Sequence, residues 1–136
     1  ELQAAVGSPA ADTSQVLRSF VQGVHAVVAR HPWLPVIWVR EILTEGGALR
    51  GLMLTQVAPM LPRMLSARLA QAQQAGALNP ALDPRLTVVS LIGLTLFPLA
   101  AESLWRQIFD ASDINPSHLQ DHTLALLERG LELRHA

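Results

Sequence analysis

The chain has no cysteine, no lysine and no tyrosine, and only 4% of its residues are aromatic. Without cysteine it can form neither a disulfide nor a thiolate metal site. All ten positive charges are arginines that are spread singly along the chain, and the formal net charge is -1. Nucleic-acid binding requires clustered cations that neutralise phosphates, so this segment by itself is a poor nucleic-acid-binding candidate.

A long hydrophobic run is also missing, although 50% of the 136 residues are hydrophobic. The longest stretch without a charge runs from Leu86 to Ala101, and Gly93 and Pro98 interrupt it. A membrane-spanning helix needs about 20 apolar residues, so we expect no membrane segment. A domain of this length buries a core. We expect the surplus apolar side chains to cover a partner surface or to line a cavity.

The hydrophobic pattern has helical periodicity, and no alternating strand pattern occurs. Residues 1–11 are expected to be a linker or the end of a helix, and residues 12–136 to form one domain. Helix start and stop signals include the capping pair Asp12 and Gln15, the terminating Gly76, and cap-then-proline pairs that begin with Asp83 and Asn115. They predict an all-α antiparallel bundle of about five helices. These run over 12–31, over 35–46, from a start between 48 and 52 to 75, over 85–109 and over 116–134.

The last two predicted helices indicate a homodimer. The fourth is apolar nearly all round, which is typical of burial on both sides. Both contain an interior glycine, Gly93 or Gly130, which permits another helix to approach closely. We expect this antiparallel pair to meet the same pair of a second copy in a four-helix interface. The expected interface residues are Val89, Ile92, Leu96, Leu119, His122, Leu126, Gly130 and Leu133.

Three prolines, Pro59, Pro62 and Pro98, lie inside predicted helices. Each removes a backbone donor and clashes with the carbonyl four residues earlier, so the third and fourth helices should kink. We interpret the void expected between them as a ligand pocket, partly walled by adaptable methionines. The alternative is that these side chains are ordinary core. The expected ligand-contacting residues are His25, Trp38, Met53, Gln56, Met60, Met64, Phe97 and Trp105.

The remaining polar residues each have two possible roles. Arg40, Glu41 and Glu102 would either orient a ligand or form surface ion pairs. His118 and His122 lie four residues apart on the last helix, where both imidazoles could face one metal ion, but no third ligand is identified. We favour a histidine pair at a solvated or interface edge, with no metal and no cofactor. No nucleophile elbow or phosphate-binding glycine loop occurs, so we do not expect an enzyme.

Three stretches carry a family resemblance: HPWLPVIWVREILTEGGALRGLM at 31–53, AGALNPALDPRL at 75–86 and INPSHLQDHTLALLERGL at 114–131. With the long apolar helix between the last two, they resemble the effector-binding and dimerisation half of TetR-type transcriptional repressors. The resemblance implies a cytoplasmic regulator that binds operator DNA as a homodimer and releases it when a small molecule enters this half. The family's helix-turn-helix half has no counterpart in this sequence, so DNA binding would require that missing half.

We therefore expect a ligand-sensing regulatory domain that responds to a hydrophobic or amphipathic small molecule. Its mechanism would be a population shift between two helix arrangements, transmitted through the second and third helices. The alternative is a helical protein–protein interaction module, in which the prolines only shape the bundle. A small helical enzyme has the least support.

Overall fold

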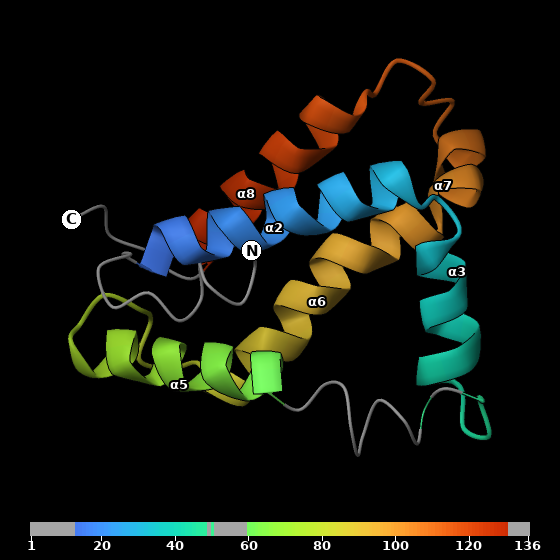
Figure 1. The fold of residues 1–136 in the computed structure, drawn as a ribbon. Coiled ribbons are helices and arrows are strands. Elements are labelled where there is room, and N and C mark those ends of the chain that lie inside the picture. The colour runs from blue at the N-terminus through green and yellow to red at the C-terminus, as the bar shows by residue number, and fades with distance from the viewer. Residues whose placement is uncertain (1–12, 49, 51–59, 131–136) are drawn as a thin grey trace.

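The computed structural model of the chain describes residues 13–48, 50 and 60–130 (Figure 1). These ranges are helical and contain no strand, which confirms the predicted all-α class. The elements are α2 (Thr13–Arg30), α3 (Leu34–Ile37), the π-helix η1 (Trp38–Leu43), α5 (Met60–Gln74), α6 (Pro84–Ala100), α7 (Glu102–Ile108) and α8 (Pro116–Gly130). Within the described ranges, no single helix has the length and hydropathy to cross a membrane. α6 and α7 reach that threshold only together, as a pair bent by 72°.

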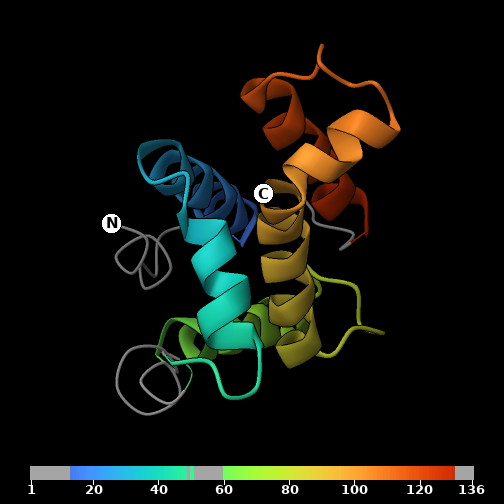
Figure 2. The same cartoon turned by 90° about the vertical axis from the view of Figure 1, so that its right-hand side faces the viewer.

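The core lies where α2, α5, α6 and α8 meet. α2 packs along α8 and also contacts α5 and α6, while α5 packs against α6 (Figures 1 and 2). Val21 on α2, Leu69 on α5 and Leu91 on α6 are completely buried. Each of these helices therefore turns one face inward to the core. The other buried members of this core are Val16, Leu17, Phe20, Leu65, Ala72, Leu78, Val88, Leu124 and Leu127.

Three threonines, Thr87, Thr95 and Thr123, are buried beside these apolar residues. Each hydroxyl donates to the backbone carbonyl four residues earlier; for Thr95 the distance to the Leu91 oxygen is 2.7 Å. An acceptor within the same helix lets the hydroxyl enter the core with its donor satisfied. The helix therefore makes these polar positions compatible with burial.

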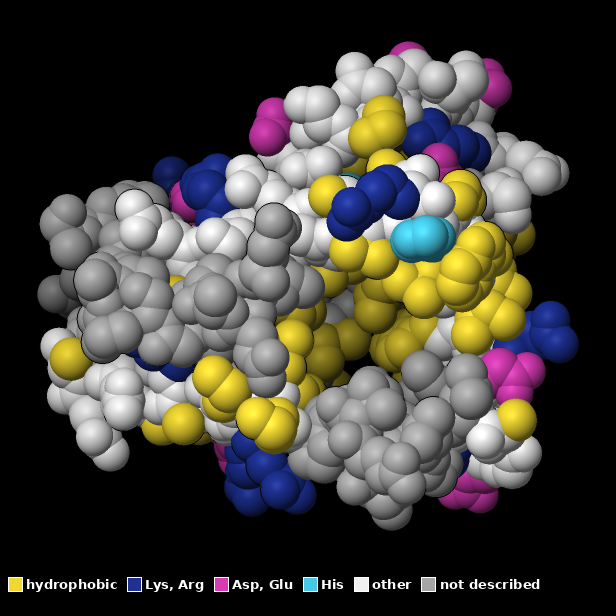
Figure 3. All heavy atoms as spheres, in the orientation of Figure 1, with side chains coloured by type: hydrophobic (Ala, Val, Ile, Leu, Met, Phe, Trp, Pro, Cys, Tyr) yellow, Lys and Arg dark blue, Asp and Glu magenta, His cyan; other side chains and the backbone are white. Residues whose placement is uncertain are grey.

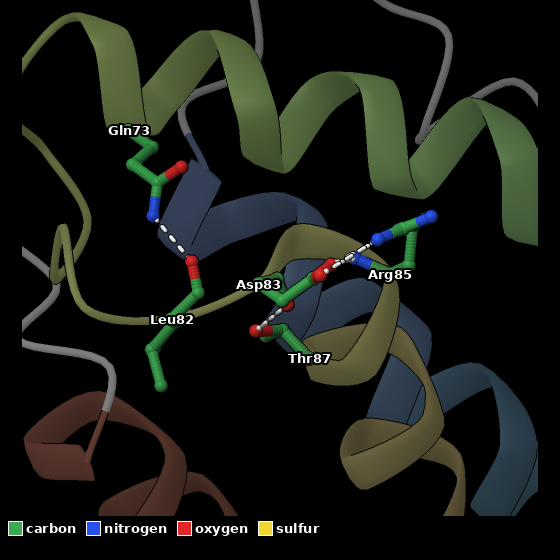
Figure 4. A network of polar contacts seen from close by, with 5 residues as sticks. All are labelled: Gln73, Leu82, Asp83, Arg85 and Thr87. Carbon is green, nitrogen blue, oxygen red and sulfur yellow. Dashed lines mark hydrogen bonds and ion pairs between the residues drawn. The ribbon is translucent and has the colours of Figure 1, made fainter.

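Polar contacts fix the corner between α5 and α6 (Figure 4). As predicted, Asp83 caps α6: its Oδ1 accepts the backbone N–H of Arg85 at 2.8 Å, and Pro84 follows at the helix start. Hydrogen bonds from the Arg85 side chain and backbone lower the pKa of Asp83 to about 2. Gln73, near the end of α5, donates from Nε2 to the Leu82 carbonyl at 2.6 Å, which closes the connecting loop.

Two further predicted boundaries are confirmed. Gly76 has a φ of 79°, and the next residue donates its N–H to the Ala72 carbonyl at 2.9 Å, which ends α5 in a left-handed turn. Asn115 precedes α8, which begins at Pro116, and its Oδ1 accepts the backbone N–H of His118 at 2.8 Å. Local capping chemistry therefore sets where these two helices end and begin.

The prediction of one helix over 85–109 is wrong. The structure divides this stretch into α6 and α7, and the break lies at Ala101. The expected kink at Pro98 is also displaced, because α6 continues through this proline before the direction changes. The Pro98 carbonyl lies in the last turn of α6 and accepts the indole N–H of Trp105 at 2.8 Å. Apolar residues occur on both sides of the break, so a prediction from periodicity alone carried one helix across it.

α6 is buried on one face only, whereas its all-round apolar composition predicted burial on both sides. The buried face consists of Thr87, Val88, Leu91 and Thr95. On the opposite side Leu86, Val89 and Phe97 are 64%, 63% and 65% exposed. The second face therefore forms an apolar surface that the other described helices leave uncovered.

The second predicted helix consists of α3 followed by the π-helix η1. Its last turn closes across five residues, with the Thr44 N–H donating to the Val39 carbonyl at 3.2 Å. The helix ends at Leu43, where Thr44 is extended, so it stops three residues before the predicted glycine pair. Gly46 has a φ of 82°, and a Cβ on Gly47 would lie 2.5 Å from the Glu41 carbonyl oxygen.

The third predicted helix is described only in its second part, as α5. Pro62 lies within α5 (Met60–Gln74). Pro59 lies outside the described residues. The kink expected at this pair of prolines stays a prediction.

Leu91→Ala is expected to lower the free energy of unfolding by about 2 to 5 kcal/mol, because it removes buried methyl groups and leaves a cavity. Leu86→Ala is the matched control, since it makes the same change on the exposed face of the same helix. We expect the control to change the free energy of unfolding by roughly 0.5 kcal/mol or less. Urea unfolding followed by circular dichroism measures both, and equal losses would contradict the burial pattern.

Candidate functional site

The α6–α7 bend is the feature from which the candidate site is built. α6 ends at Ala100 and α7 begins at Glu102, with an angle of 72° between the two helices. The Trp105 indole reaches back across the bend and donates its N–H to the Pro98 carbonyl. Carbonyls in the last turn of a helix lack partners within that helix, so this side chain caps α6 and also holds α7 across its end.

The Trp105 ring is held on a second side by Arg106. The guanidinium carbon of Arg106 lies 4.7 Å from the ring centroid, at cation–π distance. Arg106 also donates from Nε to Glu102 at 2.9 Å and from Nη1 to the Ala111 carbonyl at 2.8 Å. Because one arginine joins the start of α7, its indole and the loop after it, the ring has a fixed orientation.

The end of α7 turns the chain toward α8 (Figure 2). Asp110 has a φ of 51°, and the buried Ala111 donates its N–H to the Arg106 carbonyl at 2.9 Å. This is the hydrogen-bond pattern of a left-handed helix stop, here with aspartate in the position that glycine usually fills. The stop allows the loop to return so that the first turn of α8 faces the bend.

A pocket of about 310 Å³ lies between the bend and the start of α8. Phe97 and Pro98 come from α6, Trp105 from α7, Ile114 from the connecting loop, and His118, Leu119 and His122 from α8. This volume is at the lower end of the range for small-molecule pockets. The indole N–H is already bonded to Pro98, so the two imidazoles supply the side-chain polar groups of this wall.

His25 is the other unusual polar group near the bend. It lies on α2, is 6% exposed, and its Nε2 has no hydrogen-bond partner among the described residues. Burial lowers the pKa of the His25 imidazole, while the negative charge of Glu102 acts in the opposite direction. Because Glu102 also pairs with Arg106, His25 is linked electrostatically to the side chains that hold the Trp105 ring.

The structure brings together two of the residues that were predicted to contact a ligand. Phe97 and Trp105 both line the pocket. Met60 is 62% exposed at the start of α5, and Met64 packs against the core, so neither methionine lines this pocket. Residues of α8 line this pocket in place of the methionines, although the sequence had predicted α8 to form the dimer interface.

The remaining predicted ligand contacts lie elsewhere. His25 is buried on α2, and Trp38 is half-buried on η1. Met53 and Gln56 lie outside the described residues. On the face seen in Figure 3, hydrophobic side chains gather around a hollow between α6 and α3. That hollow adjoins the second and fourth predicted helices, which were both assigned to the pocket.

The residues predicted for the dimer interface divide by exposure. Val89, His122, Leu126 and Gly130 are exposed. Ile92, Leu96 and Leu119 are partly buried. Leu133 lies outside the described residues. Phe97 from the exposed side of α6 meets Leu119 and His122 of α8 in the pocket, so the exposed faces of the two helices adjoin there.

Two charged candidates are surface groups. The Arg40 and Glu41 side chains form an ion pair at 3.9 Å, with Arg40 largely exposed, in agreement with the surface alternative. Among the described residues, no three His, Asp or Glu side chains converge on a position suited to a metal ion. His118 and His122 instead face the apolar pocket as a pair.

Pro98, Ile114, His118, Leu119 and His122 line the pocket but were not predicted to do so. The sequence contained a usable signal for one part of this arrangement, the histidine pair with i,i+4 spacing beside a helix start. It contained none for the approach of α8 to α7, since that follows from the break at Ala101.

No protein-family model matches the chain, and no curated protein matches it.

Trp105→Phe keeps an aromatic ring but removes the indole donor to Pro98. We expect the free energy of unfolding to fall by roughly 1 kcal/mol, because a carbonyl at the bend loses its partner. Trp33→Phe, at an exposed tryptophan before α3, is the control and should have a smaller effect. Urea unfolding measures both, and an equal change in the two variants would contradict a structural role for the indole bond.

His25→Leu is expected to flatten the dependence of stability on pH. The folded state lowers the pKa of His25 below its value of about 6.5 in an unfolded chain, so the unfolded state binds the proton more readily. The free energy of unfolding of the parent should therefore decrease as pH falls below about 6.5, and the variant should lose that contribution. Urea midpoints at pH 7, 6 and 5 measure it, with His31→Gln as an exposed control. Parallel profiles for parent and His25→Leu would contradict it.

Proposed function

We propose that this chain is a ligand-sensing regulatory domain that works in the cytoplasm as a homodimer and binds a small hydrophobic or amphipathic molecule. The observation that carries the proposal is the pocket at the α6–α7 bend. Its walls come from three helices and a loop, and a fixed aromatic ring forms one side. Concave apolar sites with a few convergent polar groups are typical small-molecule sites.

The exposed apolar faces of α6 and α8 support the homodimer. Val89 is 63% exposed and Leu126 is 47% exposed, and large apolar side chains at such positions are typical of interfaces. A Cβ added at Gly93 or Gly130 would meet no atom within 4 Å. Both glycines therefore leave room for a further helix. An isologous four-helix contact would use α6 and α8 of each copy.

The resemblance to TetR-type regulators is the basis for proposing that ligand binding controls DNA binding. In that arrangement the domain carries a helix-turn-helix half that binds operator DNA, and ligand binding changes the spacing of the two DNA-binding heads. The ligand drives release only through its different affinities for the two arrangements. In this chain the helices that would transmit the change are α3 with η1, and α5.

A protein–protein interaction module is the second candidate, favoured by the exposed apolar residues of α7. Leu104, Ile108 and the adjacent Phe109 are all largely exposed, and none belongs to the predicted dimer interface. In that alternative these residues would bind a partner protein and the pocket would have no ligand. The oligomeric state and the response to small molecules distinguish the two candidates.

The expected oligomer is a dimer at micromolar concentration, measured by light scattering. Val89→Glu and Leu126→Glu should each weaken dimerisation by about 100-fold or more, because each places an unpaired charge in an apolar interface. Since both side chains are exposed in the single chain, helical content should be unchanged by circular dichroism.

Gln22→Glu adds the same charge at an exposed position on α2 and should leave the dimer intact. A monomeric parent, or equal dissociation of the parent and the two glutamate variants on dilution, would contradict the dimer. Thermal stabilisation by a panel of hydrophobic and amphipathic compounds tests the sensing role. A monomer that no compound stabilises would favour the interaction module.

A further inference from the structure

We propose that the pocket at the α6–α7 bend binds an aromatic carboxylate, whose ring lies against Phe97 and Trp105 and whose carboxylate binds His118 and His122. This inference rests on the proposed sensing function and adds the chemical class of the ligand. The proposal rests on one observation: a single small pocket has two aromatic walls and one polar edge, which two imidazoles form.

The apolar part of the pocket fits a flat ring. The Trp105 indole is fixed by its hydrogen bond to Pro98 and by the Arg106 guanidinium, so it offers a preorganised surface. Phe97 lies across the bend from it on α6 and is mostly exposed. A planar aromatic guest would contact each of these rings in the stacked or edge-to-face arrangement that aromatic pairs favour, with about 4.5–7 Å between ring centroids. About 310 Å³ has room for a molecule of two fused rings.

The polar edge favours an acceptor with two oxygens. His118 and His122 lie four residues apart on α8, which puts both imidazoles on the same side of the helix. An imidazole can donate an N–H whether neutral or protonated, so the pair can donate to both oxygens of one carboxylate. A carboxylate accepts two such bonds, while a carboxamide has one oxygen and two N–H donors.

The electrostatic surroundings also favour an anion. His118 lies in the first turn of α8, where the backbone dipoles of a 15-residue helix give a partial positive charge. The Glu102 carboxylate, on the same helix as Trp105, is paired with Arg106 at 2.9 Å, so its charge is largely compensated. A cationic ring ligand would be repelled by this partial positive charge.

The test uses 2-naphthoate as the probe and 2-naphthamide as its neutral counterpart of the same shape. Each is titrated into the full chain labelled with ¹⁵N, and the Trp105 indole N–H and the His118 and His122 ring signals are followed by NMR. We expect both probes to shift the Trp105 signal. The carboxylate should bind about tenfold more tightly or better, since one charge-assisted contact is typically worth that factor.

Three variants separate the parts of the site. The double variant His118→Gln and His122→Gln should bring naphthoate affinity down to that of naphthamide and leave naphthamide binding unchanged. Leu119→Trp should fill the pocket and weaken both probes by about tenfold or more. His31→Gln, at an exposed histidine outside the pocket, is the matched control and should change neither affinity.

Equal affinity for the two probes, or a preference that survives loss of both histidines, would overturn the carboxylate assignment while the sensing function stands. Shifts confined to Trp38 and His25 would place the ligand elsewhere in the domain and overturn this site alone. Absence of binding by either probe would overturn the aromatic class. The sensing function itself fails separately, if the chain is a monomer that no compound of the wider panel stabilises.

Discussion

The hydrogen bond from the Trp105 indole to the Pro98 carbonyl is the interaction on which the candidate site depends. It caps α6, fixes the direction of α7 and sets the orientation of the aromatic ring. Without the turn at Ala101, residues 102–109 would continue along α6 instead of crossing toward α8. The pocket exists because the chain changes direction there and then returns.

Around this bond, charged and polar groups link the bend to the core. Arg106 contacts the Trp105 ring and pairs with Glu102, and the Glu102 charge acts on the buried His25 of α2. A guest that moved the indole would therefore disturb Arg106 and Glu102, and with them the charge that acts on a buried side chain of α2. In a packed interior, such small displacements are transmitted instead of absorbed. This gives the proposed sensor a physical route from its pocket to the helices that would respond.

The proposed pocket and the proposed dimer interface share residues. Phe97 belongs to the exposed side of α6, and Leu119 and His122 belong to the α8 stripe that was predicted to meet a second copy. Ligand binding and dimer geometry would then be coupled directly, because both depend on the same side chains. The coupling is reciprocal: whatever the ligand does to the dimer, the dimer does to ligand affinity.

The sequence by itself determined the helical class and the local ends of the helices, because capping and left-handed turns depend on a few adjacent residues. Asp83, Asn115 and Gly76 act as predicted for that reason. Phe97 and Trp105 were expected in a pocket between the third and fourth predicted helices, whereas the pocket that they line lies between the α6–α7 bend and α8. Tertiary structure alone decided the break at Ala101, the exposed side of α6 and the approach of α8 to the bend. These depend on how the helices pack against one another and on a side chain that reaches back seven residues to a carbonyl, and apolar periodicity is the same on both sides of such a break.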